Sequence, residues 1–354
     1  MNKNITRKVI NIITVMSLFT FLGGCAPEGE GAKTDLAGET ESPKPSAVIG
    51  FSQVGAESDW RTANTADILS AFSADKGYDL IYDDAQQKQT NQIKAIRGFI
   101  QQEVDYIILA PVNETGWETV LQEAQDARIP VILIDRRVDV NDDELFKCWI
   151  GSDFELEGRK VCAWFENYIN SIGFPPKDVH IVNIQGTLGS SAQLGRTKGF
   201  EDSARLFGWD VVALTEGDFT RGKGREAMFN ILRTYDDVNV VYCENDNEAL
   251  GVIDVLEANG ITPGFDIAGG EVMVLSFDGV NEEALSKLAE GKIACIGQCN
   301  PNTGERVELI VRKLLEGVEP YKYQYVEEEL LSGYDGIKEI MVGGKKYDVT
   351  IVPH

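Results

Sequence analysis

The chain has 354 residues, of which 57 are acidic and 33 are Lys or Arg, so its formal net charge at pH 7 is −24. A surface of this charge repels nucleic acid and anionic lipid head groups, which argues against a DNA-binding role. The part after residue 46 spans roughly 300 residues, more than one hydrophobic core usually holds, so we expect two lobes.

The first 24 residues have the pattern of a lipoprotein signal peptide. Basic residues occur within the first eight positions, and an apolar run extends from Val9 to Leu22. This run is too short and wrongly flanked for a membrane span. The string Leu22-Gly23-Gly24-Cys25 resembles a bacterial lipobox, so we expect acylation of Cys25 to hold the chain at the extracytoplasmic face of the cell membrane. The alternative is an ordinary cleaved signal that contains a cysteine by chance.

Residues 25–46 are expected to form a flexible acidic linker. This stretch consists mainly of Gly, Pro, Glu, Ser, Thr and Ala, and Leu36 is its only large aliphatic residue. It therefore lacks the apolar surface needed to order itself.

The cysteine and histidine content argues against a metal site. The chain has two histidines and no Cys-x-x-Cys spacing, so we expect neither a metal nor a cofactor. Cys148 and Cys162 flank a strand-to-helix connection and could pair; buried free thiols are the equally open alternative. The six cysteines are Cys25, Cys148, Cys162, Cys243, Cys295 and Cys299.

From residue 47 onward, short β-branched runs alternate with amphipathic helical stretches such as 90–103 and 248–260, the latter closed by Gly260. This alternation predicts an α/β protein with parallel sheets covered by helices on both faces. Ten or more strands fit two doubly wound lobes better than one sheet. The expected strands span 47–52, 78–84, 104–111, 130–135, 148–153, 179–186, 209–218, 238–245, 272–279 and 293–298.

Polar residues follow the expected strands, at the edge where ligands bind in open α/β sheets. Turns favour Asp, Asn and Gly in any case, so a single such residue proves little. Together they offer carboxylates, amides, guanidinium groups and aromatic rings, which suit the hydroxyls and the C–H face of a sugar. The strand-end positions are Ser52, Gln53, Asp83, Asp84, Pro111, Asp135, Arg136, Gln185 to Thr187, Asp218, Phe219, Asn245, Asp246, Asp278 and Gln298.

Two pairs have both a functional and a structural interpretation. Trp60 and Arg61 open a helix after the first strand, where the tryptophan forms either a stacking wall for a ligand or a hydrophobic staple. Asp135 and Arg136 end the fourth strand. Either both side chains bind ligand hydroxyls, or Arg136 is a surface arginine that forms an ion pair with the carboxylate of Asp135.

An enzyme is a remote alternative. Paired carboxylates could process glycosides, but neighbouring arginines lower a carboxyl pKa, which is the wrong direction for a general acid. His180 lies inside an expected strand and His354 at the end of the sequence, so no Ser-His or Cys-His arrangement is expected. We therefore expect no catalytic residues.

Six segments carry a resemblance to a known family: 50–61 (GFSQVGAESDWR), 86–100 (QQKQTNQIKAIRGFI), 110–136, 217–224 (GDFTRGKG), 244–246 (END) and 276–279 (SFDG). In these segments the chain resembles the type I periplasmic-binding family, the sugar-binding proteins of bacterial ABC importers, and within it the galactofuranose-binding and ribose-binding branches.

The resemblance implies two lobes joined by a three-segment hinge, with crossings near 152–154, near 277–280 or 298–300, and about 320. The N-terminal lobe would comprise 47–152 plus about 299–319, and the C-terminal lobe 153–298 plus about 320–354. It also implies a protein that binds a monosaccharide, galactofuranose-like or another aldose or furanose, and delivers it to permease subunits in the membrane. Together with the expected lipid on Cys25, we expect a lipid-anchored monomer. A sugar sensor that presents its ligand to a chemoreceptor or sensor kinase is the alternative.

The resemblance also implies a set of ligand-binding residues. One departure is Asp59, which stands where the family pattern has a small residue; another is that the cysteines do not follow the disulfide pattern of the galactofuranose binders. The implied ligand-binding residues are Glu57, Ser58, Trp60, Arg61, Asp135, Arg136, Arg196, Phe219, Asn245, Asp278 and, by a weaker alignment, Gln298.

Overall fold

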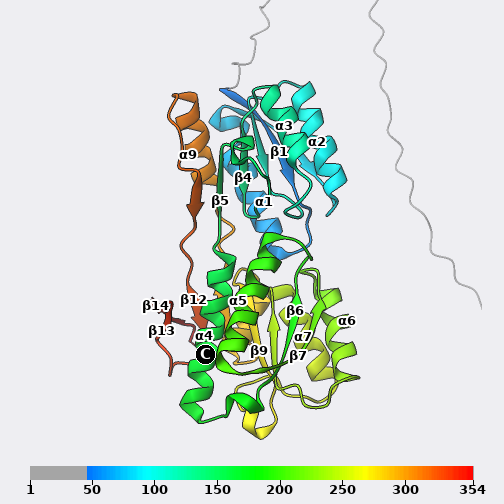
Figure 1. Cartoon of the computed structure of the whole chain (residues 1–354), viewed down its shortest axis with the longest axis vertical. Helices are drawn as coiled ribbons and strands as arrows, with labels where there is room; N and C mark the ends of the chain where they lie inside the picture. Colours follow the sequence, from blue (N-terminus) through cyan, green and yellow to red (C-terminus); the bar gives the residue numbers. More distant parts are fainter. Residues whose placement is uncertain (1–45, 354) are drawn as a thin grey trace, which may run out of the picture. The chain divides into compact units, whose positions relative to one another are not determined.

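The computed structural model describes residues 46–353, which form two α/β lobes (Figure 1). The expected signal peptide, Cys25 and all of the expected linker except residue 46 lie outside these residues. Within residues 46–353, no helix combines the length and apolar character needed to cross a membrane.

The first lobe is built on a six-stranded sheet in the order β11-β5-β4-β3-β1-β2, and all its strand pairs are parallel. Helices α1 and α9 pack on one face, and α2 and α3 on the other. The strands are β1 (Ala47–Gln53), β2 (Tyr78–Asp84), β3 (Tyr106–Leu109), β4 (Val131–Ile134), β5 (Cys148–Gly151) and β11 (Tyr323–Tyr325). The helices are α1 (Asp59–Ala71), α2 (Gln89–Gln101), α3 (Glu118–Asp126) and α9 (Gly304–Leu315).

The second lobe is built on a seven-stranded sheet in the order β15-β12-β10-β9-β8-β6-β7. Its strands are β6 (His180–Gln185), β7 (Asp210–Glu216), β8 (Val240–Cys243), β9 (Met273–Asp278), β10 (Cys295–Gln298), β12 (Leu330–Ser332) and β15 (Thr350–Ile351). Its helices are α4 (Phe154–Ile172), α5 (Ser191–Phe207), α6 (Arg221–Leu232), α7 (Asp246–Ala258) and α8 (Glu282–Ala289). A hairpin of β13 (Glu339–Val342) and β14 (Lys345–Asp348) lies against α4. Four 3₁₀ turns complete the described elements: η1 (Ala74–Lys76), η2 (Asp143–Leu145), η3 (Pro176–Asp178) and η4 (Ile267–Gly269).

The predicted fold class is confirmed. Each of the ten expected strands is present. The strand at 78–84 has the expected bounds, the first strand is one residue longer, and the other eight are shorter. The central strands are buried on both faces because helices cover both sides. The expected helix closed by a glycine is α7, and Gly260 follows it with a φ of 74°, a left-handed value that glycine adopts without strain. Within the two large sheets, the exception to the parallel pattern is β12, which pairs antiparallel with β10.

The chain passes three times between the lobes: at 152–153 after β5, at 299–303 after β10, and at 326–329 after β11. The expected third crossing near residue 320 is wrong. Tyr323 and Tyr325 of β11 pair with Trp149 and Gly151 of β5, so this strand extends the first sheet and the crossing follows it. Of the two positions expected for the second crossing, 277–280 is also wrong, because β9 and α8 belong to the same lobe.

The five described cysteines are free and buried. Cys148 lies in β5 and Cys162 in α4, on opposite sides of the first crossing. The structure therefore agrees with the free-thiol alternative for this pair.

Candidate functional site

A small cavity lies between the two lobes. Its walls contain ten of the eleven residues that the family resemblance implied. The lining residues are Glu57, Ser58, Trp60, Arg61, Asp135, Arg136, Phe154, Ala192, Arg196, Phe219, Asn245, Asp278 and Cys299.

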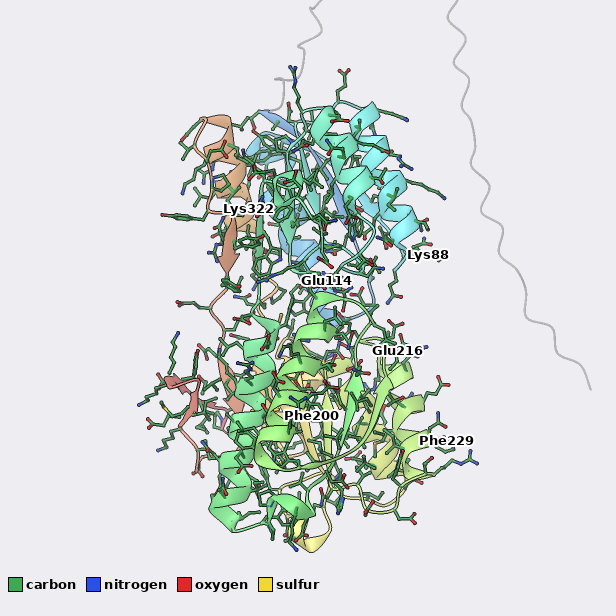
Figure 2. All side chains as sticks on the ribbon, viewed as in Figure 1. Lys88, Glu114, Phe200, Glu216, Phe229 and Lys322 are labelled. Carbon is green, nitrogen blue, oxygen red and sulfur yellow. The ribbon has the colours of Figure 1, made fainter. Side chains whose placement is uncertain are left out.

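Contacts around the cavity join the two lobes. The backbone N–H of Glu114, which lies where the lobes meet in Figure 2, donates to the carbonyl of Gly189 at 3.0 Å. Asp59 at the start of α1 accepts hydrogen bonds from the side chains of Asn247, at 3.2 Å, and Asn281. The lobes are therefore held together over the cavity, and the unexpected Asp59 is part of that contact.

Trp60 reaches the cavity from the first turn of α1. The hydroxyl of Ser58 caps this helix by accepting from the backbone N–H of Arg61 at 3.1 Å. The Trp60 indole N–H donates to the carbonyl of Cys299 at 2.7 Å, and its ring packs with Phe154 and Phe219. Because these partners come from the second crossing and the second lobe, the staple interpretation does not describe Trp60.

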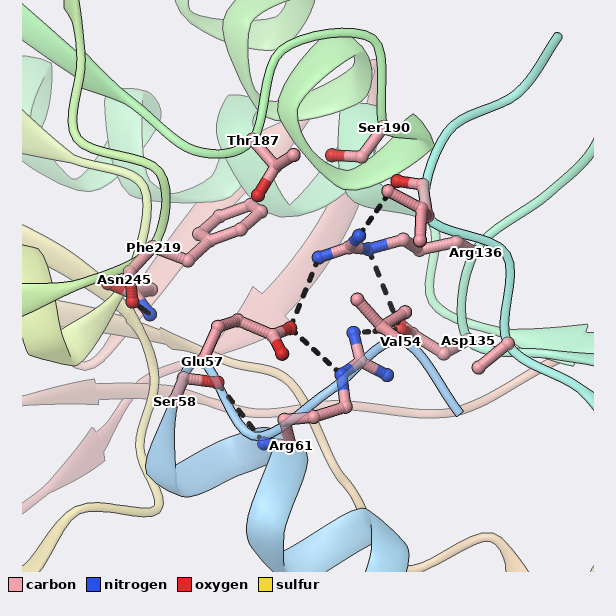
Figure 3. Close-up of polar contacts among 12 residues, drawn as sticks. Val54, Glu57, Ser58, Arg61, Asp135, Arg136, Thr187, Ser190, Phe219 and Asn245 are labelled. Carbon is pink, nitrogen blue, oxygen red and sulfur yellow. Dashed lines mark hydrogen bonds and ion pairs between the residues drawn. The ribbon is translucent and has the colours of Figure 1, made fainter. Parts of the chain in front are cut away.

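Two arginines and two carboxylates form a buried network on the first lobe's side (Figure 3). Arg61 lies between Glu57 Oε1, at 3.0 Å from its Nε, and Asp135 Oδ2, at 2.7 Å from its Nη2. Arg136 Nη1 donates to the carbonyl of Val112 at 2.9 Å, and Arg136 Nη2 lies 3.5 Å from Glu57 Oε1. Arg136 is 1% exposed, so the surface interpretation of this residue is wrong.

The network fixes the charge of its members. Burial opposes ionisation of Glu57, but the guanidinium groups of Arg61 and Arg136 outweigh it and lower the pKa of this carboxyl group. Burial and the neighbouring charge of Arg61 together lower the pKa of Arg136 from its usual high value. Glu57 is therefore ionised at neutral pH, as the network requires.

Arg196 from α5 supplies the second lobe's main charge. It is 2% exposed, its Nε lies 2.9 Å from Glu157 Oε2, and its Nη2 lies 3.2 Å from Asp278 Oδ1. Its guanidinium carbon lies 5.5 Å from the ring centroid of Phe154 and 4.8 Å from that of Phe277, in cation–π contact with both rings. Burial raises the pKa of Asp278 to about 6 although Arg196 opposes this effect, so the Asp278 carboxylate titrates close to neutrality.

Three of the predicted site residues have left-handed backbone conformations: Asp135 with φ 60°, Phe219 with φ 57° and Asp278 with φ 89°. Each residue stands at or just after the end of a strand, in a conformation that is unfavourable for residues other than glycine. Such strain is typical of functional sites, where the surrounding structure holds a side chain in one direction.

Buried acids after β8 hold the loops that carry these residues. Glu248 accepts from the backbone N–H of Phe219 at 2.8 Å, and Asp246 accepts from that of Gly279 at 2.9 Å. Asn245 donates to the carbonyl of Phe219 at 3.0 Å and caps α7. Burial raises the pKa of Asp246 to about 7. The amide of Asn245 therefore positions Phe219 in addition to lining the cavity.

Gln298 does not line the cavity. Its side-chain oxygen accepts from the backbone N–H of Glu329 at 3.2 Å, so it holds the third crossing against β10. Three residues of the lining, Phe154, Ala192 and Cys299, were not among the residues predicted from the sequence. Phe154 could have been predicted from the sequence, because it is an aromatic residue at the start of a helix that follows a strand, as Trp60 is.

The lining is electrically balanced. It contains three arginines and three carboxylates, and its apolar part consists of Trp60, Phe154, Ala192, Phe219 and Cys299. Glu57 Oε2 and Arg136 Nε are buried and have no hydrogen-bond partner among the described residues. Because unpaired buried polar atoms are costly, such atoms favour a ligand with hydroxyl groups that donate and accept. The site thus suits a small, neutral, polyhydroxylated molecule.

Comparison with known proteins agrees with this geometry. A family described as "Periplasmic binding protein domain" matches residues 49–319. The chain belongs to this family. Among curated proteins, this periplasmic binding protein is similar to the galactofuranose-binding protein YtfQ of Escherichia coli (strain K12), with 36% identity over 288 residues that cover 80% of this chain and 87% of the relative.

Solved structures give the same result. A protein from Mycobacterium smegmatis in complex with β-D-fucofuranose has a TM-score of 0.76 and 37% identity, covering 81% of this chain and 91% of that one. The binding component of the arabinose ABC transporter from Shewanella sp. ANA-3, bound to α- and β-L-arabinofuranose, has a TM-score of 0.74 and 35% identity, covering 80% and 91%. YtfQ and the Shewanella protein are named as binding proteins rather than enzymes.

Proposed function

We propose that this periplasmic binding protein binds one monosaccharide, in its five-membered furanose ring form, between its two lobes. The observation that carries the proposal is the lining of the cavity: three arginines balanced by three carboxylates, next to the rings of Trp60, Phe154 and Phe219. The guanidinium and carboxylate groups match the hydroxyls of a sugar, and the rings match its C–H face.

The proposal of a single sugar unit rests on the same lining, because residues of both lobes face one small cavity. The furanose form is proposed because the two solved relatives contain fucofuranose and arabinofuranose.

We further propose that the protein delivers this sugar as a monomer to an ABC permease, while a lipid on Cys25 holds it at the membrane. Hinge rotation at the three crossings would close the lobes, since a ligand that contacts both lobes favours the closed state. The anchor rests on the sequence Leu22-Gly23-Gly24-Cys25. In the native host, Cys25→Ser should move the protein from the membrane fraction to the soluble fraction; retention in the membrane fraction would contradict the lipid anchor.

Calorimetric titration of residues 46–354 with L-arabinose, D-fucose, D-galactose and D-ribose tests the binding proposal. Each sugar supplies only its furanose fraction, so the apparent affinity of a furanose binder falls by that fraction. NMR of the bound sugar, labelled with ¹³C at the anomeric carbon, then identifies the ring form. Saturable binding of a furanose is the expected result; a pyranose in the bound state, or binding of none of the four sugars, would contradict the proposal.

A further inference from the structure

The three crossings between the lobes meet at one side chain, that of Glu328. Its Oε1 accepts from the hydroxyl of Ser152 in the first crossing at 2.5 Å, and from the backbone N–H of Asn300 in the second crossing at 2.9 Å. Glu328 itself belongs to the third crossing. One carboxyl oxygen therefore joins all three segments that have to bend when the lobes move.

The same carboxyl group faces a second acid. One carboxyl oxygen of Glu157, one of Glu328 and the Sγ atom of Cys299 all lie within 4.8 Å of one another. Glu157 is 2% exposed, and no described residue donates a hydrogen bond to its buried Oε1. Two ionised carboxylates this close in a buried site repel each other, so one proton between them is favoured.

The other charged groups around the pair agree with a shared proton. Lys160 of α4 donates to the backbone carbonyl of Glu328 at 3.0 Å rather than to its carboxyl group, and Arg196 of α5 is already paired with Glu157 Oε2. Burial raises the pKa of the Cys299 thiol well above its ordinary value, so this thiol stays neutral. Because Arg196 is paired with Glu157, the shared proton is assigned to Glu328. Burial and the nearby charge of Glu157 raise the pKa of Glu328 to about 9, which agrees with this assignment.

We infer that Glu328 is a positioning residue: it keeps its proton at neutral pH, donates it in a hydrogen bond to Glu157 Oε1, and so connects the three crossings to the sugar cavity. The connection runs through Glu157 Oε2 to Arg196, and from Arg196 to Asp278, both of which line the cavity. This inference rests on the proposed function only for its effect on sugar affinity; the proton itself is independent of any ligand.

The first test uses the ligand-free protein and two variants. Glu328→Gln reproduces the protonated group, because its amide oxygen accepts from Ser152 and Asn300 while its NH₂ donates to Glu157. In wild type, the folded state binds the Glu328 proton more tightly than the unfolded state, so the free energy of unfolding decreases as the pH rises from about 4.5 to about 9. Glu328→Gln carries no such proton and lacks this decrease. The melting temperature of wild type should therefore fall relative to that of Glu328→Gln between about pH 6 and pH 9.

Infrared spectroscopy gives a direct readout of the proton. Other buried acids such as Asp246 also carry protons near pH 7, so the readout is a difference spectrum. The wild-type minus Glu328→Gln spectrum at pH 7 should contain the absorption of one protonated carboxyl group. The wild-type minus Glu327→Gln spectrum should lack it; Glu327 is an exposed glutamate of the same crossing. Parallel pH profiles of the three proteins together with no such absorption would overturn the inference. A rise in wild-type melting temperature on adding Zn²⁺, absent in Glu328→Gln, would overturn it as well, because a cation would then join the carboxylates.

The second test measures the connection to the cavity with L-arabinose. Glu328→Ala should weaken binding at least about tenfold at pH 7, because Glu157 loses its hydrogen bond and Arg196 loses its fixed position, while Glu328→Gln should restore affinity to within about threefold of wild type. Equal weakening in both variants, or in neither, would contradict the positioning role. If no sugar binds wild type, the proposed function fails for that probe, and the ligand-free titration still decides whether the proton is present.

Discussion

Asp135 separates a binding role from a purely structural role, because its carboxylate serves both the cavity and an ion pair. Its Oδ2 lies 2.7 Å from Arg61 Nη2, and both side chains are at least 95% buried. We expect Asp135→Ala to weaken sugar binding strongly while leaving most of the ligand-free stability intact.

The magnitudes follow from the contacts. Since Oδ2 lies against Arg61, one carboxylate oxygen remains for a sugar hydroxyl, and a hydrogen bond to a charged group is worth about 1.5–3 kcal/mol, or roughly 10- to 150-fold in affinity. Breaking a buried ion pair usually costs about 3–5 kcal/mol. Here Arg61 keeps Glu57 at 3.0 Å as a second partner, so the loss of stability should stay below about 3 kcal/mol.

Calorimetric titration measures the affinity, and urea unfolding of the ligand-free protein measures the stability. Asp135→Asn keeps the shape and removes the charge, so it should weaken binding without enlarging the cavity. Asp84→Ala is the matched control: this exposed aspartate ends β2, the edge strand of the same sheet, and does not line the cavity, so its variant should resemble wild type. A stability loss above about 3 kcal/mol with affinity within threefold of wild type would make Asp135 a structural ion-pair residue and refute the reasoning.

Three further changes test other parts of the site. Trp60→Ala should weaken binding about tenfold through loss of the stacking face, measured by calorimetry, and unchanged affinity would contradict that role. Asp59→Ala removes the contact with Asn247 and Asn281 across the cavity, so sugar dissociation in stopped flow should become up to about fivefold faster with little change in association. Burial raises the pKa of Glu244 to about 7, so the folded state favours the protonated form and the stability of the protein falls as the pH rises from about 4.5 to 7. Glu244→Gln should therefore flatten the dependence of the melting temperature on pH over this range. An unchanged dependence would argue against the raised pKa.

The sequence by itself determined the architecture of the lobes. Alternating apolar runs and amphipathic stretches predicted parallel strands under two helical layers, because strands that are buried on both faces need apolar side chains on both faces. The strand-end rule and the family resemblance together predicted ten residues of the cavity lining, since local pattern dictates where each strand ends and the carboxyl ends of parallel strands share one edge.

Only the tertiary structure decided how distant segments combine. That β11 joins the first sheet beside Trp149, and that Gln298 holds a crossing instead of the cavity, depends on pairings between residues far apart in the chain. The contacts of Glu328 likewise connect three crossings that are separated by more than 20 residues, so no local pattern signals them. The physical reason is that strand propensity and hydrophobic period are local properties, whereas the choice of partner depends on which surfaces folding brings together.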